Sequence, residues 1–350
     1  MIVADLFAGV GGLSQGFIKA GCDIAFAVEF DREIAAAYQK NHPQTEVFAE
    51  DICQLNIEDI KQRHPIIDIV MGGPPCQGFS QKGKRLSLND PRNFLFKQFV
   101  RFVNAYKPKY FVLENVPNII TTSNGYFKEQ IIHEFKELGY DVCCGILHAS
   151  DFGVPQDRRR AVFIGQMGKL EVKLPTPNGY KTSIKDAIYD LPFIASGEGQ
   201  EESKYDKEPT STFQKQLRNG STVLYNHTAT KHSKDAIEKL KLIPKGMGKE
   251  VLPEHMLTKS IYSGTWSRLP EDGIAPTITT RFDTPSSGRF THPILHRCLT
   301  VREAARIQTF PDSFIFYGPR GSQMKQVGNA VPPMLAYAIA NVIVENEKHK

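Results

Sequence analysis

The chain has 350 residues, of which 41% are hydrophobic and 23% are charged, and its formal net charge is +5. This composition is ordinary for a soluble globular protein of one large domain or two, and it shows neither a signal peptide nor a membrane span. The six cysteines are too sparse for a disulfide framework and lack paired metal-ligand spacing, so we expect no metal and a cytoplasmic location.

The first half of the chain alternates short apolar runs with amphipathic stretches of helical period. We expect strands over residues 2–8, 23–30, 45–52, 67–73, 110–116, 141–150 and 160–166, and helices over 32–42, 95–108 and 125–139. Buried strands that alternate with helices predict an α/β fold with a doubly wound, mostly parallel sheet. Ligands in such folds bind beyond the carboxyl ends of the strands.

The pattern changes near residue 175, where a turn-rich segment begins. We expect a catalytic and cofactor-binding domain over 1–175 plus 323–350, and a second, smaller, irregular, β-rich domain over 176–322. Within the second domain, residues 176–276 are polar and weakly periodic. Thr300 with Glu303 predicts a capping box at the start of a helix. The final segment predicts a helix that begins at prolines and docks onto the first domain.

DLFAGVGGLSQGF, from Asp5 to Phe17, is typical of a strand, a glycine-rich turn and a helix. Its glycine spacing differs from the dinucleotide fingerprint, and no lysine follows as in a P-loop. Glu29 ends the second predicted strand, and Asp51 follows the third. Either acid alone is more often a helix cap or a surface charge. Together, in this order, they favour a cofactor that carries a nucleoside.

GGPPCQGFS, from Gly72 to Ser80, follows a predicted buried strand. Pro74 and Pro75 fix φ and lack an N–H, so neither a helix nor a central strand can continue there. This corner directs Cys76 toward a cleft, as a nucleophile requires. A buried, inert cysteine is the alternative. A nucleophilic thiol would need neighbouring cations to become a thiolate at neutral pH.

Basic residues gather in two places. From Gln77 to Lys109 there are eight lysines or arginines against one acid, and QDRRR runs from Gln156 to Arg160. One such run is usually a solvated face, but two near one candidate site favour a polyanionic partner. Glu114 ends the predicted strand 110–116 and should face the same cleft as Cys76. There it would transfer a proton or pair with one of the arginines.

DLFAGVGG, GGPPCQGFS, ENV, QDRRR, LTVREAARIQTFPD and QVGNAVPP occur in the order seen in the cytosine-C5 DNA methyltransferases, and the chain resembles that family. The resemblance covers about 1–175 and 290–350, while 176–276 matches only the family's variable target-recognition segment. It implies the cofactor S-adenosylmethionine and double-stranded DNA as substrate. The residues implied in cofactor binding are Phe7, Gly9, Gly11, Glu29, Asp51, Gly73, Pro75, Leu95 and Asn329.

The resemblance also implies roles in catalysis. Cys76 would add to C6 of a flipped-out cytosine, Glu114 would act at N3, and Arg158 and Arg160 would hold O2 and nearby phosphates. The loop Gln77–Arg92 would close over the base. The residues implied in DNA binding are Ser80, Lys82, Lys84, Arg85, Gln156, Arg268 and Arg281, with Gln156 supporting its loop.

Other residues have simpler interpretations. Arg302 and Arg306 are expected to bind carboxylates rather than DNA, and His227 and His232 to be structural histidines rather than zinc ligands. The short chain is typical of a stand-alone prokaryotic restriction-modification methyltransferase, a monomer without membrane contact that shares its target with a cognate endonuclease. The alternatives are a tRNA cytosine methyltransferase and a non-catalytic nucleic-acid-binding relative. A nicotinamide dehydrogenase is disfavoured, because Cys76 would then have no role.

Overall fold

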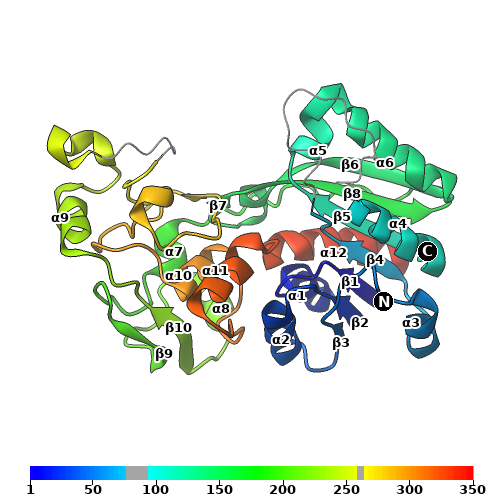
Figure 1. Ribbon diagram of the computed structural model, residues 1–350, viewed down its shortest axis with the longest axis horizontal. Coiled ribbons are helices and arrows are strands. Elements are labelled where there is room, and N and C mark those ends of the chain that lie inside the picture. The colour runs from blue at the N-terminus through cyan, green and yellow to red at the C-terminus, as the bar shows by residue number, and fades with distance from the viewer. Residues whose placement is uncertain (76–93, 258–263, 350) are drawn as a thin grey trace. The chain divides into compact units, whose positions relative to one another are not determined.

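The structure is a computed structural model that describes residues 1–75, 94–257 and 264–349 (Figure 1). The chain divides into two compact units. Unit 1 comprises Met1–His148, Arg159–Pro177 and Pro333–Lys350, and unit 2 comprises Ala149–Arg158 and Asn178–Pro332. The break after Pro177 lies close to the boundary expected at 175. Residues 149–158 and 323–332 belong to unit 2, however, which differs from the expected limits.

A seven-stranded sheet with the order β3-β2-β1-β4-β5-β8-β6 forms the centre of unit 1. In this order, β3, β2, β1, β4 and β5 are parallel to one another, whereas β8 runs antiparallel to both β5 and β6. Each strand coincides with one expected from the sequence, so the doubly wound, mostly parallel α/β fold is confirmed. The strands are β1 (Ile2–Leu6), β2 (Asp23–Val28), β3 (Glu46–Phe48), β4 (Ile69–Gly72), β5 (Tyr110–Asn115), β6 (Tyr140–His148) and β8 (Arg159–Met167).

Helices cover both faces of this sheet. Apolar side chains of α3, α4 and α6 form one hydrophobic core with alternate residues of the strands. On the other face α1 packs against α12, where a Cβ on Gly16 would lie 2.4 Å from the Cβ of Ala336. The expected docking of the last helix onto the first domain is therefore confirmed. The helices of unit 1 are α1 (Gly12–Lys19), α2 (Arg32–Asn41), α3 (Ile57–Arg63), α4 (Phe94–Tyr106), α5 (Asn118–Thr121), α6 (Tyr126–Glu137) and α12 (Pro333–Lys348).

Unit 2 is built mainly from helices and irregular segments. Over its described residues, regular strand pairing is limited to the antiparallel β9/β10 and the parallel β7/β11, so the expectation of a β-rich domain is wrong. The strands are β7 (Gln156–Asp157), β9 (Gly199–Lys204), β10 (Val223–Thr228) and β11 (Ala275–Pro276), and the α-helices are α7 (Ile184–Ile188), α8 (Thr212–Arg218), α9 (Lys234–Leu242), α10 (Val301–Ile307) and α11 (Arg320–Asn329).

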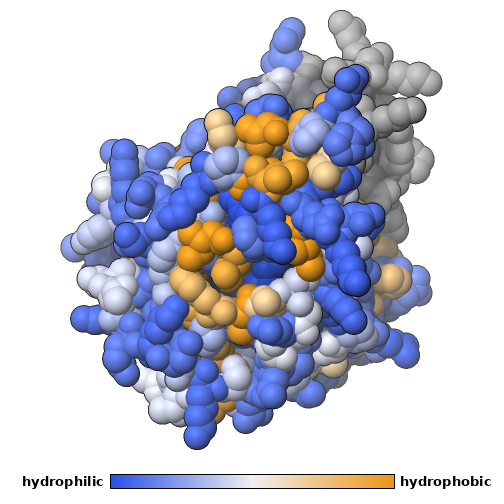
Figure 2. Space-filling view, turned by 90° about the vertical axis from the view of Figure 1, so that its left-hand side faces the viewer, coloured by the Kyte–Doolittle hydropathy of each residue, from blue (hydrophilic) through white to orange (hydrophobic). Residues whose placement is uncertain are grey.

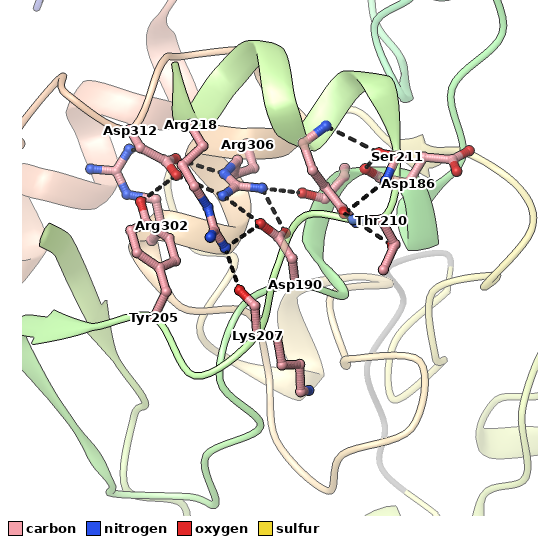
Figure 3. A network of polar contacts seen from close by, with 12 residues as sticks. Asp186, Asp190, Tyr205, Lys207, Thr210, Ser211, Arg218, Arg302, Arg306 and Asp312 are labelled. Atoms are coloured by element: carbon pink, nitrogen blue, oxygen red, sulfur yellow. Dashed lines mark hydrogen bonds and ion pairs between the residues drawn. The ribbon is translucent and has the colours of Figure 1, made fainter. Parts of the chain in front are cut away.

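Buried ion pairs occupy the centre of unit 2 (Figure 3). Arg306 on α10 is fully buried and pairs with Asp312 at 2.6 Å and with Asp190 at 2.9 Å. Arg218 on α8 also contacts Asp190, at 2.9 Å. The expectation that Arg306 binds carboxylates is confirmed. Charged groups thus join α8 and α10 to the segments that follow α7 and α10.

The start of α10 has the expected cap. Thr300 and Glu303 form a capping box, and Glu303 also pairs with Arg297 at 2.7 Å. Arg302 donates to the backbone carbonyls of Tyr225, Pro311 and Phe314, and its nearest carboxylate contact, with Asp312, measures 3.7 Å. Arg302 is therefore bound chiefly by carbonyl oxygens rather than by the expected carboxylate.

One face of unit 2 carries apolar side chains among polar ones (Figure 2). Four exposed apolar residues, Leu242, Met247, Val251 and Leu257, come from the stretch between the end of α9 and residue 257. Among the described helices, none is by itself long and apolar enough to cross a bilayer. Only the bent pair α11 and α12 passes by length and composition, and α12 is partly buried against α1.

Candidate functional site

The glycine-rich turn lies between β1 and α1, at the carboxyl end of β1. Phe7, Gly9 and Gly11 have φ values of 58°, 57° and 97°, in the left-handed region that non-glycine residues seldom adopt. At Gly11 there is also no space for a side chain, since a Cβ would lie 2.4 Å from Nε2 of His42. The turn therefore depends on glycine for both its conformation and its packing.

Glu29 follows β2 and holds this turn. Its two carboxylate oxygens accept hydrogen bonds from the backbone N–H groups of Gly9 and Asp31, each at 2.9 Å. Burial raises the pKa of Glu29. The next residue in the sequence, Phe30, is apolar and 73% exposed. We did not predict Phe30 from the sequence, although an aromatic residue directly after the acid was a usable signal.

Asp51 follows β3, the next strand along the sheet. Its Oδ1 accepts a hydrogen bond from the backbone N–H of Cys53 at 3.0 Å, and this bond lowers the pKa of Asp51. Because β3, β2 and β1 are neighbours and parallel, the glycine turn, Glu29 and Asp51 all lie at one edge of the sheet. The predicted cofactor residues from these three strands are thus brought to the same side.

Asp5, on β1, is a buried carboxyl group that we did not predict. Its Oδ2 accepts from the Ser14 hydroxyl at 2.6 Å, and that hydroxyl lies 2.7 Å from the Tyr38 hydroxyl. Its Oδ1 has no hydrogen-bond partner among the described residues. Burial, opposed in part by the Ser14 bond, raises the pKa of Asp5 to about 7. The group therefore changes charge near neutral pH, directly below the glycine turn.

The Gly72–Pro75 corner follows β4, on the opposite side of β1 from β2. Pro74 is buried and Pro75 is exposed. A Cβ on Gly73 would lie 2.8 Å from Oε2 of Glu114, the last residue but one of β5. Leu95, another predicted cofactor residue, lies in the first turn of α4 and packs against the core of unit 1.

Glu114 forms an ion pair with Arg160. The Arg160 Nε lies 2.6 Å from Glu114 Oε1, and the Arg160 and Glu114 side chains are only 14% and 11% exposed. The antiparallel register of β5 and β8, with Glu114 opposite Val162, brings the start of β8 to the end of β5. The pairing with an arginine that the sequence suggested is therefore present, and it holds the carboxylate beside Gly73.

Arg158 and Gln156 belong to unit 2, and both are buried. Gln156 donates to Oε1 of Gln308 and accepts from the N–H of Ile278, while Arg158 donates to the carbonyls of Ile278 and Gly328, both at 3.1 Å. Neither side chain presents its polar group at the surface. These contacts join the segment 149–158 to Ile278, Gln308 and Gly328 within unit 2.

Arg268 is also a structural residue. It is 2% exposed, and its guanidinium donates to the carbonyls of Leu240, Ile243, His292 and Leu295. The guanidinium of Arg268 is thus bound within unit 2.

Arg281 is exposed, as is Asn329 at the end of α11 in unit 2. His227 forms hydrogen bonds with the Thr300 hydroxyl and the Pro192 carbonyl, and His232 accepts a hydrogen bond from the Cys298 N–H, so both rings take part in internal hydrogen bonds.

The predicted residues that lie outside the described residues are Cys76, Ser80, Lys82, Lys84 and Arg85, together with their loop Gln77–Arg92.

Comparison with known proteins covers the whole chain. The profile of the family "C-5 cytosine-specific DNA methylase" matches residues 1–345. The chain is 41% identical to the type II methyltransferase M.DdeI of Desulfomicrobium norvegicum, over 98% of this chain and 88% of that protein. It is 37% identical to the type II methyltransferase M1.HphI of Haemophilus parahaemolyticus, over 97% and 86% of the two chains.

Comparison with solved structures also finds methyltransferases. The crystal structure of a candidate DNA modification methyltransferase encoded within an E. coli prophage matches with a TM-score of 0.81 and 30% identity, over 100% of both chains. A DNMT2 mutant of Spodoptera frugiperda matches with a TM-score of 0.64 and 16% identity, over 98% of this chain and 99% of that one, which shows the shared fold alone. On the evidence of its motifs, its sheet and the profile match over residues 1–345, the chain belongs to the family of C-5 cytosine-specific DNA methylases.

Proposed function

We propose that this enzyme methylates C5 of a cytosine within a specific duplex DNA sequence through a covalent bond between Cys76 and cytosine C6. Membership of the family makes the chain a DNA (cytosine-5)-methyltransferase with S-adenosylmethionine as methyl donor. The observation that carries the finer proposal is the Glu114–Arg160 ion pair, which holds a carboxylate beside the corner that leads to Cys76.

The residues at the sheet edge fit the cofactor. The bare backbone at Gly9 and Gly11 lets a ligand approach closely, and Glu29 is already fixed by the turn it holds. Carboxylates suit ribose hydroxyls and an adenine amine, the roles proposed for Glu29 and Asp51. We assign Phe30 to the adenine face because its ring is exposed and it follows Glu29 in the sequence. Phe7, Gly73, Pro75, Leu95 and Asn329 complete the proposed set.

The cofactor supplies an electrophilic methyl group, but cytosine C5 is too electron-poor to take it unaided. The thiolate of Cys76 forms a bond to C6 while Glu114 protonates or hydrogen-bonds N3, and the electron pair of the C5–C6 double bond becomes available at C5. C5 takes the methyl group as the bond between that group and the sulfonium sulfur breaks. C5 then loses its proton to solvent and N3 returns its proton to Glu114, while the bond between Cys76 and C6 breaks, the thiolate leaves and the ring is restored. Arg160 keeps Glu114 directed at the base.

The cytosine must leave the stacked duplex to reach these groups, so we propose base flipping. We assign target choice to unit 2, with exposed Arg281 as a candidate contact, since arginine to guanine is the commonest specific contact with DNA bases. M.DdeI and M1.HphI are both named type II methyltransferases. By that analogy we propose that this chain protects its target from a cognate endonuclease. Because one chain carries one proposed active site, we also propose that it acts as a monomer.

The test uses methyl-labelled S-adenosylmethionine with unmethylated duplex DNA and, in parallel, tRNA, followed by mass spectrometry of the nucleosides. We expect label in 5-methyldeoxycytidine with the natural protein and with Cys144→Ala, a matched control on β6, but none with Cys76→Ala. Label confined to tRNA 5-methylcytidine would refute the DNA substrate. Transfer by Cys76→Ala would refute the covalent step.

A further inference from the structure

The corner before Cys76 and the end of β5 leave the sheet side by side. β4 and β5 are parallel neighbours, with Gly72 opposite Leu113 as their last pair. Gly73 and Pro74 therefore run beside Glu114 and Asn115. Cys76 follows Pro74 by two residues in the sequence and lies outside the described residues.

Asn115 binds this corner through its side chain. Its Nδ2 donates to the Pro74 carbonyl at 2.9 Å, and its Oδ1 accepts from the N–H of Val116 at 2.8 Å. The second bond fixes the orientation of the amide, because a flipped amide would set its NH2 against the N–H of Val116. Asn115 is 6% exposed and Pro74 is buried, so the carbonyl needs a donor from the protein.

Glu114 restrains the same corner from the adjacent position. Its Oε2 occupies the space where Gly73 would carry a Cβ, and Arg160 holds its Oε1. Two consecutive side chains of β5 thus act on two consecutive residues after β4. Glu114 already has a chemical role in the proposed reaction, whereas Asn115 contacts the backbone of this corner through the Pro74 carbonyl.

We propose that Asn115 is a positioning residue for the nucleophile, and that its bond to the Pro74 carbonyl sets the path of the chain into Cys76. This inference rests on the proposed function, because it acts through the thiol assigned there. Asn115 acts without touching the base or the cofactor. Its loss should therefore slow methyl transfer while leaving cofactor affinity intact.

The test compares Asn115→Asp and Asn115→Ala with the natural protein. Aspartate keeps the size of the side chain and the acceptor for the Val116 N–H but loses the donor to Pro74, and alanine loses the donor without adding a charge. We expect both to lower the single-turnover rate at saturating DNA and S-adenosylmethionine by at least about tenfold. The dissociation constant for the cofactor, measured by calorimetry, should change by less than about twofold. Asn118→Ala, an exposed asparagine on α5, is the matched control and should keep the natural rate.

A second measurement follows alkylation of Cys76 by iodoacetamide, by mass spectrometry of its peptide, and we expect a changed rate in both Asn115 variants. Natural rates of transfer and alkylation in both variants would overturn the proposal. A parallel loss of cofactor affinity or of far-ultraviolet circular dichroism would assign Asn115 to folding and would also overturn it. Cys76→Ala is assayed alongside, since transfer by that variant would refute the proposed function instead.

Discussion

Replacing Arg306 by methionine removes the centre of the buried ion network in unit 2. Its guanidinium donates twice to Asp312, both at 2.6 Å, twice to Asp190, at 2.9 and 3.2 Å, and once to the Ala187 carbonyl at 2.9 Å. In the variant Asp190 keeps Arg218, and Asp312 keeps a hydrogen bond from Tyr205. Removing one partner of a buried pair costs about 3–5 kcal/mol, and because other donors remain we expect about 3 kcal/mol here.

The assay has an intrinsic probe. The chain has one tryptophan, Trp266, which is 7% exposed within an apolar cluster of unit 2. Urea unfolding followed by its fluorescence should show the loss of about 3 kcal/mol in Arg306→Met. Arg281→Met makes the same change at an exposed arginine and should alter stability by no more than about 0.5 kcal/mol.

A double variant tests the cause of this loss. Arg306→Met with Asp312→Asn removes one of the abandoned carboxylates and should regain part of the stability, because burial alone raises the pKa of Asp312 and the pairing with Arg306 outweighs that effect. A loss below about 1 kcal/mol in the single variant would refute the reasoning. A double variant no more stable than the single one would refute it as well.

Two further predictions concern unit 1. Because burial raises the pKa of Asp5 from 3.8 to about 7, the folded state holds a proton that the unfolded state releases, so stability falls as the pH rises from about 4 to about 7. Each pH unit in this range changes the free energy of unfolding of the natural protein by about 1.4 kcal/mol, whereas Asp5→Asn lacks this titration. The difference in free energy of unfolding between Asp5→Asn and the natural protein should therefore shift in favour of the variant by up to about 4 kcal/mol from about pH 4 to about pH 7. Urea unfolding followed by circular dichroism measures this, and a difference that stays constant with pH would contradict it. Glu29→Ala removes the acceptor that holds Gly9, and calorimetry should show binding of S-adenosylmethionine weakened by about tenfold or more. Equal affinities for Glu29→Ala and the exposed control Glu33→Ala would count against that role.

The strands of unit 1 could be predicted because a sheet covered on both faces requires continuous apolar runs. The antiparallel direction of β8 could not be predicted, because the hydrophobic pattern of a strand does not show in which direction it runs relative to its neighbours. The antiparallel course of β8 is what brings Arg160 to the end of β5. The sequence therefore suggested that Glu114 could pair with an arginine of QDRRR, but only the structure identifies that arginine as Arg160.

The partners of the buried arginines in unit 2 could not be predicted for a different reason, although a carboxylate was expected for Arg306. Arg306 and Asp190 are 116 residues apart, and neither belongs to an apolar pattern that would mark it as buried. Arg158 and Arg268 were taken for anion-binding residues because arginine binds phosphate well. Its five N–H donors equally suit a set of buried carbonyl groups, and that use leaves no trace in a single sequence. Asn115 was missed because the motif ENV drew attention to its carboxylate alone.

The β7/β11 ladder constrains how target specificity can be inherited. β7 reaches unit 2 on the short segment 149–158, yet its partner β11 lies at the far end of the region expected to vary. A recombination event that replaces residues 178–274 keeps β11 and the bonds from Gln156 and Arg158 to Ile278. A crossover beyond Ala275 would replace β11 by the strand of another protein, which would then have to pair with the original β7. We therefore expect a new specificity to spread through such lineages as a cassette whose downstream end falls before Ala275.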